Sequence, residues 1–221
     1  AVDAAIAAGQ LVYVTSCWGE ARVGQQLDST SALPESDRFA LRLVALAAPE
    51  AADGEDPPAP FVPADAVESA IAWKHALLRD NGPTAMIFSR QTLPHQVGAA
   101  EQIEGVHRGG YVLMREQGDL DAIVIATGSE VALAVEAACR LTQAGRGVRV
   151  VSMPCAEVFE AQEAGYREAV LPSDVLARVA VEAGHTDVWY KYVGLDGRVV
   201  GMSSFGESAP AEALFKHLSL I

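Results

Sequence analysis

The stretch Ala122–Ser152, AIVIATGSEVALAVEAACRLTQAGRGVRVVS, decides the fold. Ala122–Ala126 is entirely apolar and Val148–Ser152 is mostly so, and each run predicts a buried strand. Between them, Glu130–Ala144 has the apolar spacing of a helix, which Gly145–Gly147 ends. A strand, a helix and a second strand in this order predict a parallel β-α-β unit.

The rest of the C-terminal half continues this alternation. Further strands are predicted at Ala177–Val181 and Val199–Met202, with a short helix at Tyr166–Val170. Ser208 is expected to cap a last helix that runs through Leu218. The predicted fold class is therefore α/β, with a mostly parallel sheet flanked by helices.

Upstream, a helix and a strand predict part of a second α/β domain. Asp65 is a typical N-cap residue and Glu68 follows three positions later, which is the pattern of a capping box. The helix is predicted to run to about Asp80, where the sequence Asn81-Gly82-Pro83 ends it. Thr84–Phe88 (TAMIF) then predicts a buried strand.

Residues 15–62 show no sustained periodicity, although Val12–Val14 just before them has the character of a strand. Pro49–Pro60 (PEAADGEDPPAP) is acidic and rich in proline and predicts loop or disorder. Ala40–Ala48 is compatible with a short helix. We therefore expect the segment to build no strands beside Thr84–Phe88 and to leave this domain incomplete.

Composition excludes several classes of function. The net charge of −13 argues against a nucleic-acid partner, which requires clustered Lys and Arg. No stretch predicts a membrane span or a basic membrane-surface helix, so no membrane partner is expected. The three cysteines lack metal-site spacing and are odd in number, and the N-terminus has no signal-peptide pattern. These features predict a cytoplasmic protein.

Several motifs, in collinear order from about Val62 to the end, are similar to transketolases. They are Val62–Gln91 (VPADAVESAIAWKHALLRDNGPTAMIFSRQ), Arg108–Leu113 (RGGYVL), Ile125–Val131 (IATGSEV), Val150–Pro154 (VVSMP) and Arg178–Leu214, which contains VAVEAG, WYKYVGLDG and SFGESAPAEAL. The resemblance implies that residues 1–96 are a partial and aberrant pyrimidine-binding domain. It further implies that residues 97–110 are a linker and residues 111–221 a transketolase C-terminal domain.

The resemblance also implies an activity for the parent protein. Transketolases transfer a two-carbon ketol unit between sugar phosphates in the pentose phosphate pathway. They use thiamine diphosphate and a divalent cation, Mg or Ca, and the parent would be a homodimer. The chain lacks the Gly-Asp-Gly motif that binds metal and diphosphate. We therefore expect no cofactor, metal or catalytic residue in this chain, and no activity of the chain alone.

One segment departs from the family pattern. The family carries Thr-His-Asp-Ser-Ile-Gly and Asp-Gly-Pro-Thr-His-Gln before the position of Pro63, whereas this chain has no histidine before His75. A frameshifted or mis-assembled reading and a divergent homologue are the two explanations. An alternative function is accordingly a non-catalytic C-terminal domain, or an inactive homologue, with a binding or regulatory role.

Arg90 is the one substrate-binding candidate. It directly follows the predicted strand Thr84–Phe88 in the sequence Ser89-Arg90-Gln91, and ligands of parallel sheets gather at the carboxyl ends of strands. A guanidinium suits bidentate binding of a phosphate, and the resemblance implies this role for Arg90. Ser89 and Gln91 point to other faces and are expected to be structural.

Other patterns have plainer interpretations. Gly206–Pro210 is close to a nucleophile-elbow pattern but is better explained as a helix cap. Thr127–Ser129 is a possible anion site at a helix start, but an ordinary strand-to-helix turn is favoured. The aromatic side chains at 189, 190 and 192 are expected to serve packing or an interface. No metal-ligand spacing relates the five histidines, although His95 lies close enough to Arg90 to line a substrate channel.

Overall fold

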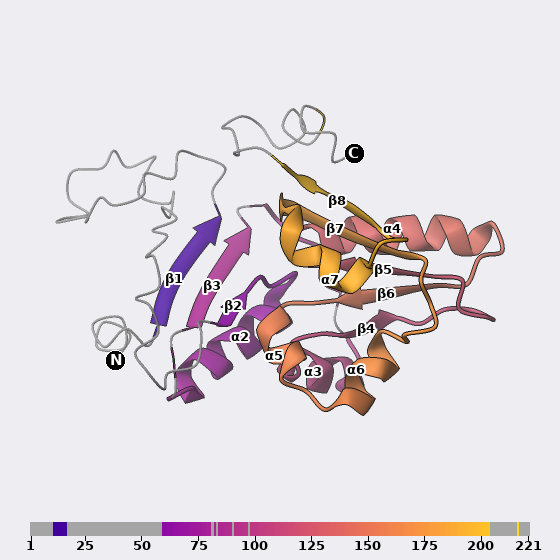
Figure 1. Cartoon of the computed structure of the whole chain (residues 1–221). Coiled ribbons are helices and arrows are strands. Elements are labelled where there is room, and N and C mark those ends of the chain that lie inside the picture. Colours follow the sequence, from indigo (N-terminus) through magenta and orange to yellow (C-terminus); the bar gives the residue numbers. More distant parts are fainter. Residues whose placement is uncertain are drawn as a thin grey trace.

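The computed structural model describes residues 11–16, 59–80, 82, 84–89, 91–96, 98–203 and 216. Its strands form two sheets that lie side by side, one of three strands and one of five (Figure 1). No helix within the described ranges is long and apolar enough to cross a membrane.

The five-stranded sheet forms the C-terminal half, and its order is β4-β6-β5-β7-β8. The strands are β4 (Tyr111–Met114), β5 (Ala122–Ala126), β6 (Val148–Ser152), β7 (Arg178–His185) and β8 (Arg198–Met202). Only β4, at one edge, is antiparallel to its neighbour, and the other described pairs are parallel. The predicted α/β class with a mostly parallel sheet is confirmed.

Helices cover both faces of this sheet. The described helices are α2 (Ala66–Leu78), α3 (Ala100–His107), α4 (Glu130–Gln143), α5 (Ala156–Glu160), α6 (Ala164–Val170), the 3-10 helix η2 (Thr186–Trp189) and α7 (Tyr190–Val193). Val124 and Val150 pack on one face with residues of α2, α3 and α4. Ile123, Ile125 and Val151 pack on the opposite face with α5, α6 and α7. Two covered faces explain why β5 and β6 are apolar throughout.

The three-stranded sheet has the order β1-β3-β2, and both neighbours are parallel to β3. Its strands are β1 (Leu11–Ser16), β2 (Ala59–Phe61) and β3 (Thr84–Ser89). The expectation that no strand would form beside Thr84–Phe88 is wrong, because β2 pairs with β3. The predicted loop is likewise wrong at its end, where Ala59 and Pro60 begin β2. Pro60 is tolerated there because β2 is an edge strand of this sheet.

The segment expected to be a linker, residues 97–110, contains helix α3. Gln102 holds its start, since the side-chain oxygen accepts from the backbone N–H groups of Gly98 and Ala99, at 3.1 and 2.9 Å. Its Nε2 donates to the Leu113 carbonyl at 2.7 Å, which connects α3 to β4. The helices predicted at 40–48 and from Ser208 onward lie outside the described residues, apart from Lys216.

Candidate functional site at the end of β3

Arg90 lies outside the described residues, but the chain on both sides of it is described. Ser89 is the last residue of β3, and its Oγ accepts from the Gln91 backbone N–H at 3.1 Å. This hydrogen bond joins the end of the strand to the residue that follows Arg90. Ser89 therefore has the structural role predicted for it, at the carboxyl end of the central strand of the small sheet.

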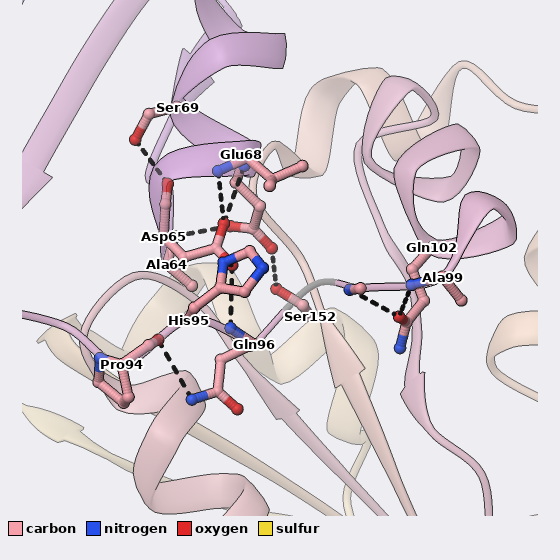
Figure 2. Close-up of polar contacts among 12 residues, drawn as sticks. Ala64, Asp65, Glu68, Ser69, Pro94, His95, Gln96, Ala99, Gln102 and Ser152 are labelled. Atoms are coloured by element: carbon pink, nitrogen blue, oxygen red, sulfur yellow. Dashed lines mark hydrogen bonds and ion pairs between the residues drawn. The ribbon is translucent and has the colours of Figure 1, made fainter.

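Asp65 attaches the segment after Arg90 to the start of α2 (Figure 2). Its Oδ2 accepts from the Gln96 backbone N–H at 3.0 Å and lies 3.0 Å from His95 Nδ1. The Asp65 side chain is 1% exposed and that of His95 is 60% exposed. His95, considered as a residue lining a substrate channel, is thus bound to a buried carboxylate.

Asp65 is also the N-cap of α2, as predicted. Its Oδ1 accepts from the backbone N–H groups of Val67 and Glu68 at 2.9 and 3.0 Å, and Ser69 Oγ donates to its carbonyl at 2.7 Å. These bonds satisfy two of the four N–H groups that a helix start leaves without partners. One carboxylate therefore both begins the helix and holds residues 95 and 96.

Glu68 does not close the predicted capping box. Its Oε2 accepts from the Ala64 N–H at 2.6 Å, one residue before the N-cap. Its Oε1 accepts from Tyr111 Oη at 3.0 Å. It also accepts from Ser152 Oγ at 2.7 Å (Figure 2). The side chain turns inward because β4 and β6 offer two hydroxyl donors there, and Glu68 is fully buried.

Burial raises the pKa of Glu68 from 4.5 to about 6. The hydrogen bonds from Ser152, Ala64 and Tyr111 oppose this rise because they stabilise the carboxylate. The negative charge of Asp65 adds to it. Burial also raises the pKa of Tyr111, which therefore acts as a hydrogen-bond donor.

Tyr111 reaches Glu68 because α3 has a glycine at position 105. A Cβ on Gly105 would lie 2.4 Å from Tyr111 Cβ, so only glycine lets β4 pass this close to the helix. The sequence alone gave no sign of the contacts of Tyr111 and Ser152 with Glu68, because their partner is 43 or 84 residues away.

The turn at Thr127–Ser129, considered as an anion site, contacts the backbone near α2. The Gly128 N–H and Thr127 Oγ1 both donate to the Val62 carbonyl, at 3.1 and 3.0 Å. The Val62 N–H in turn donates to the Pro154 carbonyl at 2.8 Å. Because these two donors of the turn bind a backbone carbonyl, the structure supports an ordinary strand-to-helix turn, the interpretation favoured from the sequence.

The remaining candidates have structural partners. Trp189 Nε1 donates to Glu182, and Tyr192 Oη donates to Glu160. His75 Nε2 lies 3.0 Å from the His107 carbonyl oxygen, and burial lowers the pKa of His75. In the described part of the chain, no three His, Cys, Asp or Glu side chains gather to hold a metal ion. Gly206–Pro210 and His217 lie outside the described residues.

The chain has many curated relatives. Transketolase 2 of Vibrio vulnificus (strain CMCP6) is 60% identical over 154 residues, which are 70% of this chain and 23% of the relative. Transketolase 2 of Aliivibrio fischeri (strain ATCC 700601 / ES114) is 56% identical over the same length. The chain thus matches about a quarter of the length of these relatives.

Solved structures agree in fold. Transketolase from Leishmania mexicana is 44% identical with a TM-score of 0.66, covering 74% of this chain and 23% of that one. The Pichia stipitis transketolase in complex with sedoheptulose-7-phosphate is 36% identical, with the same TM-score and coverage. The family described as the transketolase-like TK C-terminal domain matches residues 109–220, about half of the chain. The chain therefore belongs to the transketolase family, in the portion that ends with the transketolase C-terminal domain.

Proposed function

We propose that this chain supplies the phosphate-binding Arg90 and the C-terminal domain to a transketolase reaction that it does not complete alone. In that reaction a two-carbon ketol unit passes between sugar phosphates. The observation that carries the proposal is the 60% identity to transketolases over 154 residues. The sugar phosphate bound to the Pichia stipitis relative supports the substrate class.

The cofactor implied by the family is thiamine diphosphate with a divalent cation. The described residues do not fit it, because they include no cluster of three His, Cys, Asp or Glu side chains that would hold the metal. The sequence also has no Gly-Asp-Gly. We therefore assign no step of cofactor chemistry to this chain. The groups that hold cofactor and metal would come from the remaining three quarters of a transketolase, in a cytoplasmic homodimer.

Arg90 would act through charge and geometry. It follows the central strand of a parallel sheet, where ligand-binding side chains gather. A guanidinium offers paired N–H donors that match two phosphate oxygens. Among the described neighbours of Arg90, Ser89 Oγ accepts from the Gln91 N–H and Asp65 accepts from the Gln96 N–H.

The isolated chain is expected to show no ketol transfer and no saturable binding of thiamine diphosphate. The physical reason is the missing set of metal and diphosphate ligands. Isothermal titration with thiamine diphosphate and magnesium measures binding, and a coupled assay with xylulose and ribose phosphates measures turnover. Tight, saturable cofactor binding would overturn this part of the proposal.

Arg90 can be tested in a chimera in which residues 62–220 replace the matching part of Vibrio vulnificus transketolase 2. Arg90→Ala is expected to raise KM for phosphorylated substrates about tenfold to a hundredfold, since losing a charged hydrogen bond costs about 1.5–3 kcal/mol. Thiamine diphosphate affinity should stay unchanged.

The matched control is Arg140→Ala, which removes an exposed arginine on α4 that pairs with Glu136. Arg140→Ala should leave the KM values for the phosphorylated donor and acceptor unchanged. An unphosphorylated donor should be nearly indifferent to Arg90→Ala. An equal rise in KM for phosphorylated and unphosphorylated donors would show that Arg90 does not bind the phosphate.

A further inference from the structure

Among the described residues, two polar connections join the N-terminal elements to the five-stranded sheet. The first is the backbone of Val62, which bonds to Gly128 and Pro154 and cannot titrate. The second is Glu68 on α2, whose partners lie on β4 and β6. Apolar packing accompanies them, because Ala64 and Ile71 belong to the same core cluster as Val124. We call this contact region between α2 and the strands β4 and β6 the joint.

Glu68 is an unusual group for such a place. It is fully buried and accepts three hydrogen bonds, two of them from hydroxyls across the joint. No lysine, arginine or histidine of the described residues forms an ion pair with it. The other titratable groups that face it are Asp65 at the helix start and Tyr111 on β4. His95 is paired with Asp65 rather than with Glu68. A buried carboxylate without a cation is costly.

We infer that Glu68 makes the joint sensitive to pH, so that protonation of this carboxyl tightens the packing of α2 on β4 and β6 and ionisation loosens it. The neutral form can keep its contacts. The hydroxyls of Ser152 and Tyr111 rotate, so one of them can accept the carboxyl proton while the other still donates. The Ala64 N–H keeps an acceptor in both states.

The direction and range of the effect follow from the raised pKa. A carboxyl whose pKa rises from 4.5 when exposed to about 6 when buried favours the closed joint most at pH below the lower value. This preference is lost as pH rises through about 6. The difference between those two pKa values makes the equilibrium constant for opening about 30-fold larger at pH well above 6 than at pH well below 4.5.

The readout must be local, because other buried carboxyls have raised pKa values too. Glu130 on α4, Glu157 on α5 and Glu182 on β7 are raised by burial. They also make the stability of the whole molecule depend on pH. Protection of individual amides against hydrogen exchange separates opening at the joint from global unfolding.

The experiment compares protection factors between about pH 4.5 and about pH 7.5 in the 221-residue chain. The Ala64 amide and the amides of α2 report on the joint, and those of Val124 and Val150 report on the core. Between these two pH values, protection at the joint should fall about 15-fold relative to the core, because about half of the exposed carboxyl is already ionised at the lower pH. Glu68→Gln should abolish this change, whereas the matched control Glu130→Gln should keep it. A constant ratio in the wild type, or a change that persists in Glu68→Gln, would overturn the inference.

A second measurement does not require that variant to fold. The carboxyl carbon of Glu68, followed by NMR in the wild type, should titrate with a midpoint near 6. Ser152→Ala removes a donor that stabilises the carboxylate, so the midpoint should move to higher pH. A midpoint at the ordinary glutamate value, or a shift to lower pH in Ser152→Ala, would contradict the proposed switch.

Discussion

Replacing Arg149 by alanine is expected to lower the free energy of unfolding by about 3 kcal/mol. Arg149 lies in β6 and is 6% exposed. Its guanidinium donates to both Glu116 oxygens at 2.8 and 2.6 Å. It also donates to the carbonyls of Ala169 and Val170 at 2.9 and 3.2 Å. Alanine would leave a carboxylate and two carbonyls without their donor in a place that water reaches poorly.

The loss of stability in Arg149→Ala should depend on pH, because the partner of Arg149 is the titratable carboxyl of Glu116. The hydrogen bond from Arg149 lowers the pKa of Glu116 below its ordinary value. A carboxyl with a lowered pKa stabilises the fold above its unfolded pKa, and this contribution disappears as pH falls through the folded pKa. Urea denaturation should therefore show the full difference from wild type at about pH 7 and a smaller one at about pH 3.

The control for Arg149 is Arg140→Ala on α4. Arg140 also pairs with a glutamate, Glu136, but their side chains are 77% and 60% exposed. An exposed pair contributes at most about 1 kcal/mol, so the change should be small. Losses of the same size in both variants would mean that burial does not give the Arg149 pair its strength.

Apolar runs predicted the central strands of the C-terminal sheet accurately, whereas no strand was predicted at β4 and β7 extends four residues beyond its predicted end. The predicted strands at 122–126 and 148–152 coincide with β5 and β6, and the predicted helix between them ends one residue later than α4. Strands covered on both faces have no polar side, and the glycines leave little freedom for where they end. Arg149 interrupts this pattern, and no local feature of the sequence shows that its charge is buried with Glu116.

Elements that depend on distant neighbours escaped prediction. Strand β2 contains Pro60 and follows an acidic segment, so only its pairing with β3 reveals it. Helix α3 includes Gly105, which lowers helix propensity, and it is stabilised by Gln102 and by contact with β4. In both cases tertiary packing overrides a weak local preference.

The sequence predicted individual residues of the candidate site but not the contacts between them. Asp65 was identified as a helix cap from its spacing to Glu68, and this is confirmed. The same spacing could not show that Asp65 also binds His95 and Gln96, or that Glu68 turns toward Tyr111. A capping pattern describes contacts within one turn of helix, whereas these partners come from other elements. The role of Arg90 stays a prediction.

Gly109→Ala is expected to lower the free energy of unfolding by about 4 kcal/mol, the largest effect predicted for this chain. Gly109 joins α3 to β4 with φ +79°, a conformation that costs alanine about 1 kcal/mol. A Cβ there would also lie 2.4 Å from the Cys155 carbonyl oxygen and 2.5 Å from the Phe159 nitrogen. These are backbone atoms of α5 and of its N-cap Cys155, so no side-chain rotation relieves the clash. Moving α5 away would break the hydrogen bond from the Cys155 N–H to the Gly109 carbonyl, 2.9 Å long.

The turn at Gly118 offers a matched control for this effect. Its φ is +78°, nearly the same as at Gly109, but a Cβ there would meet nothing within 4 Å. Gly118→Ala should therefore cost only about 1 kcal/mol, which is the backbone contribution alone. Urea denaturation measures the free energy of unfolding of both variants. The expected difference between them, about 3 kcal/mol, is the cost of the clash with α5. Equal losses at the two glycines would show that α5 can move aside and that backbone conformation is the only constraint on Gly109.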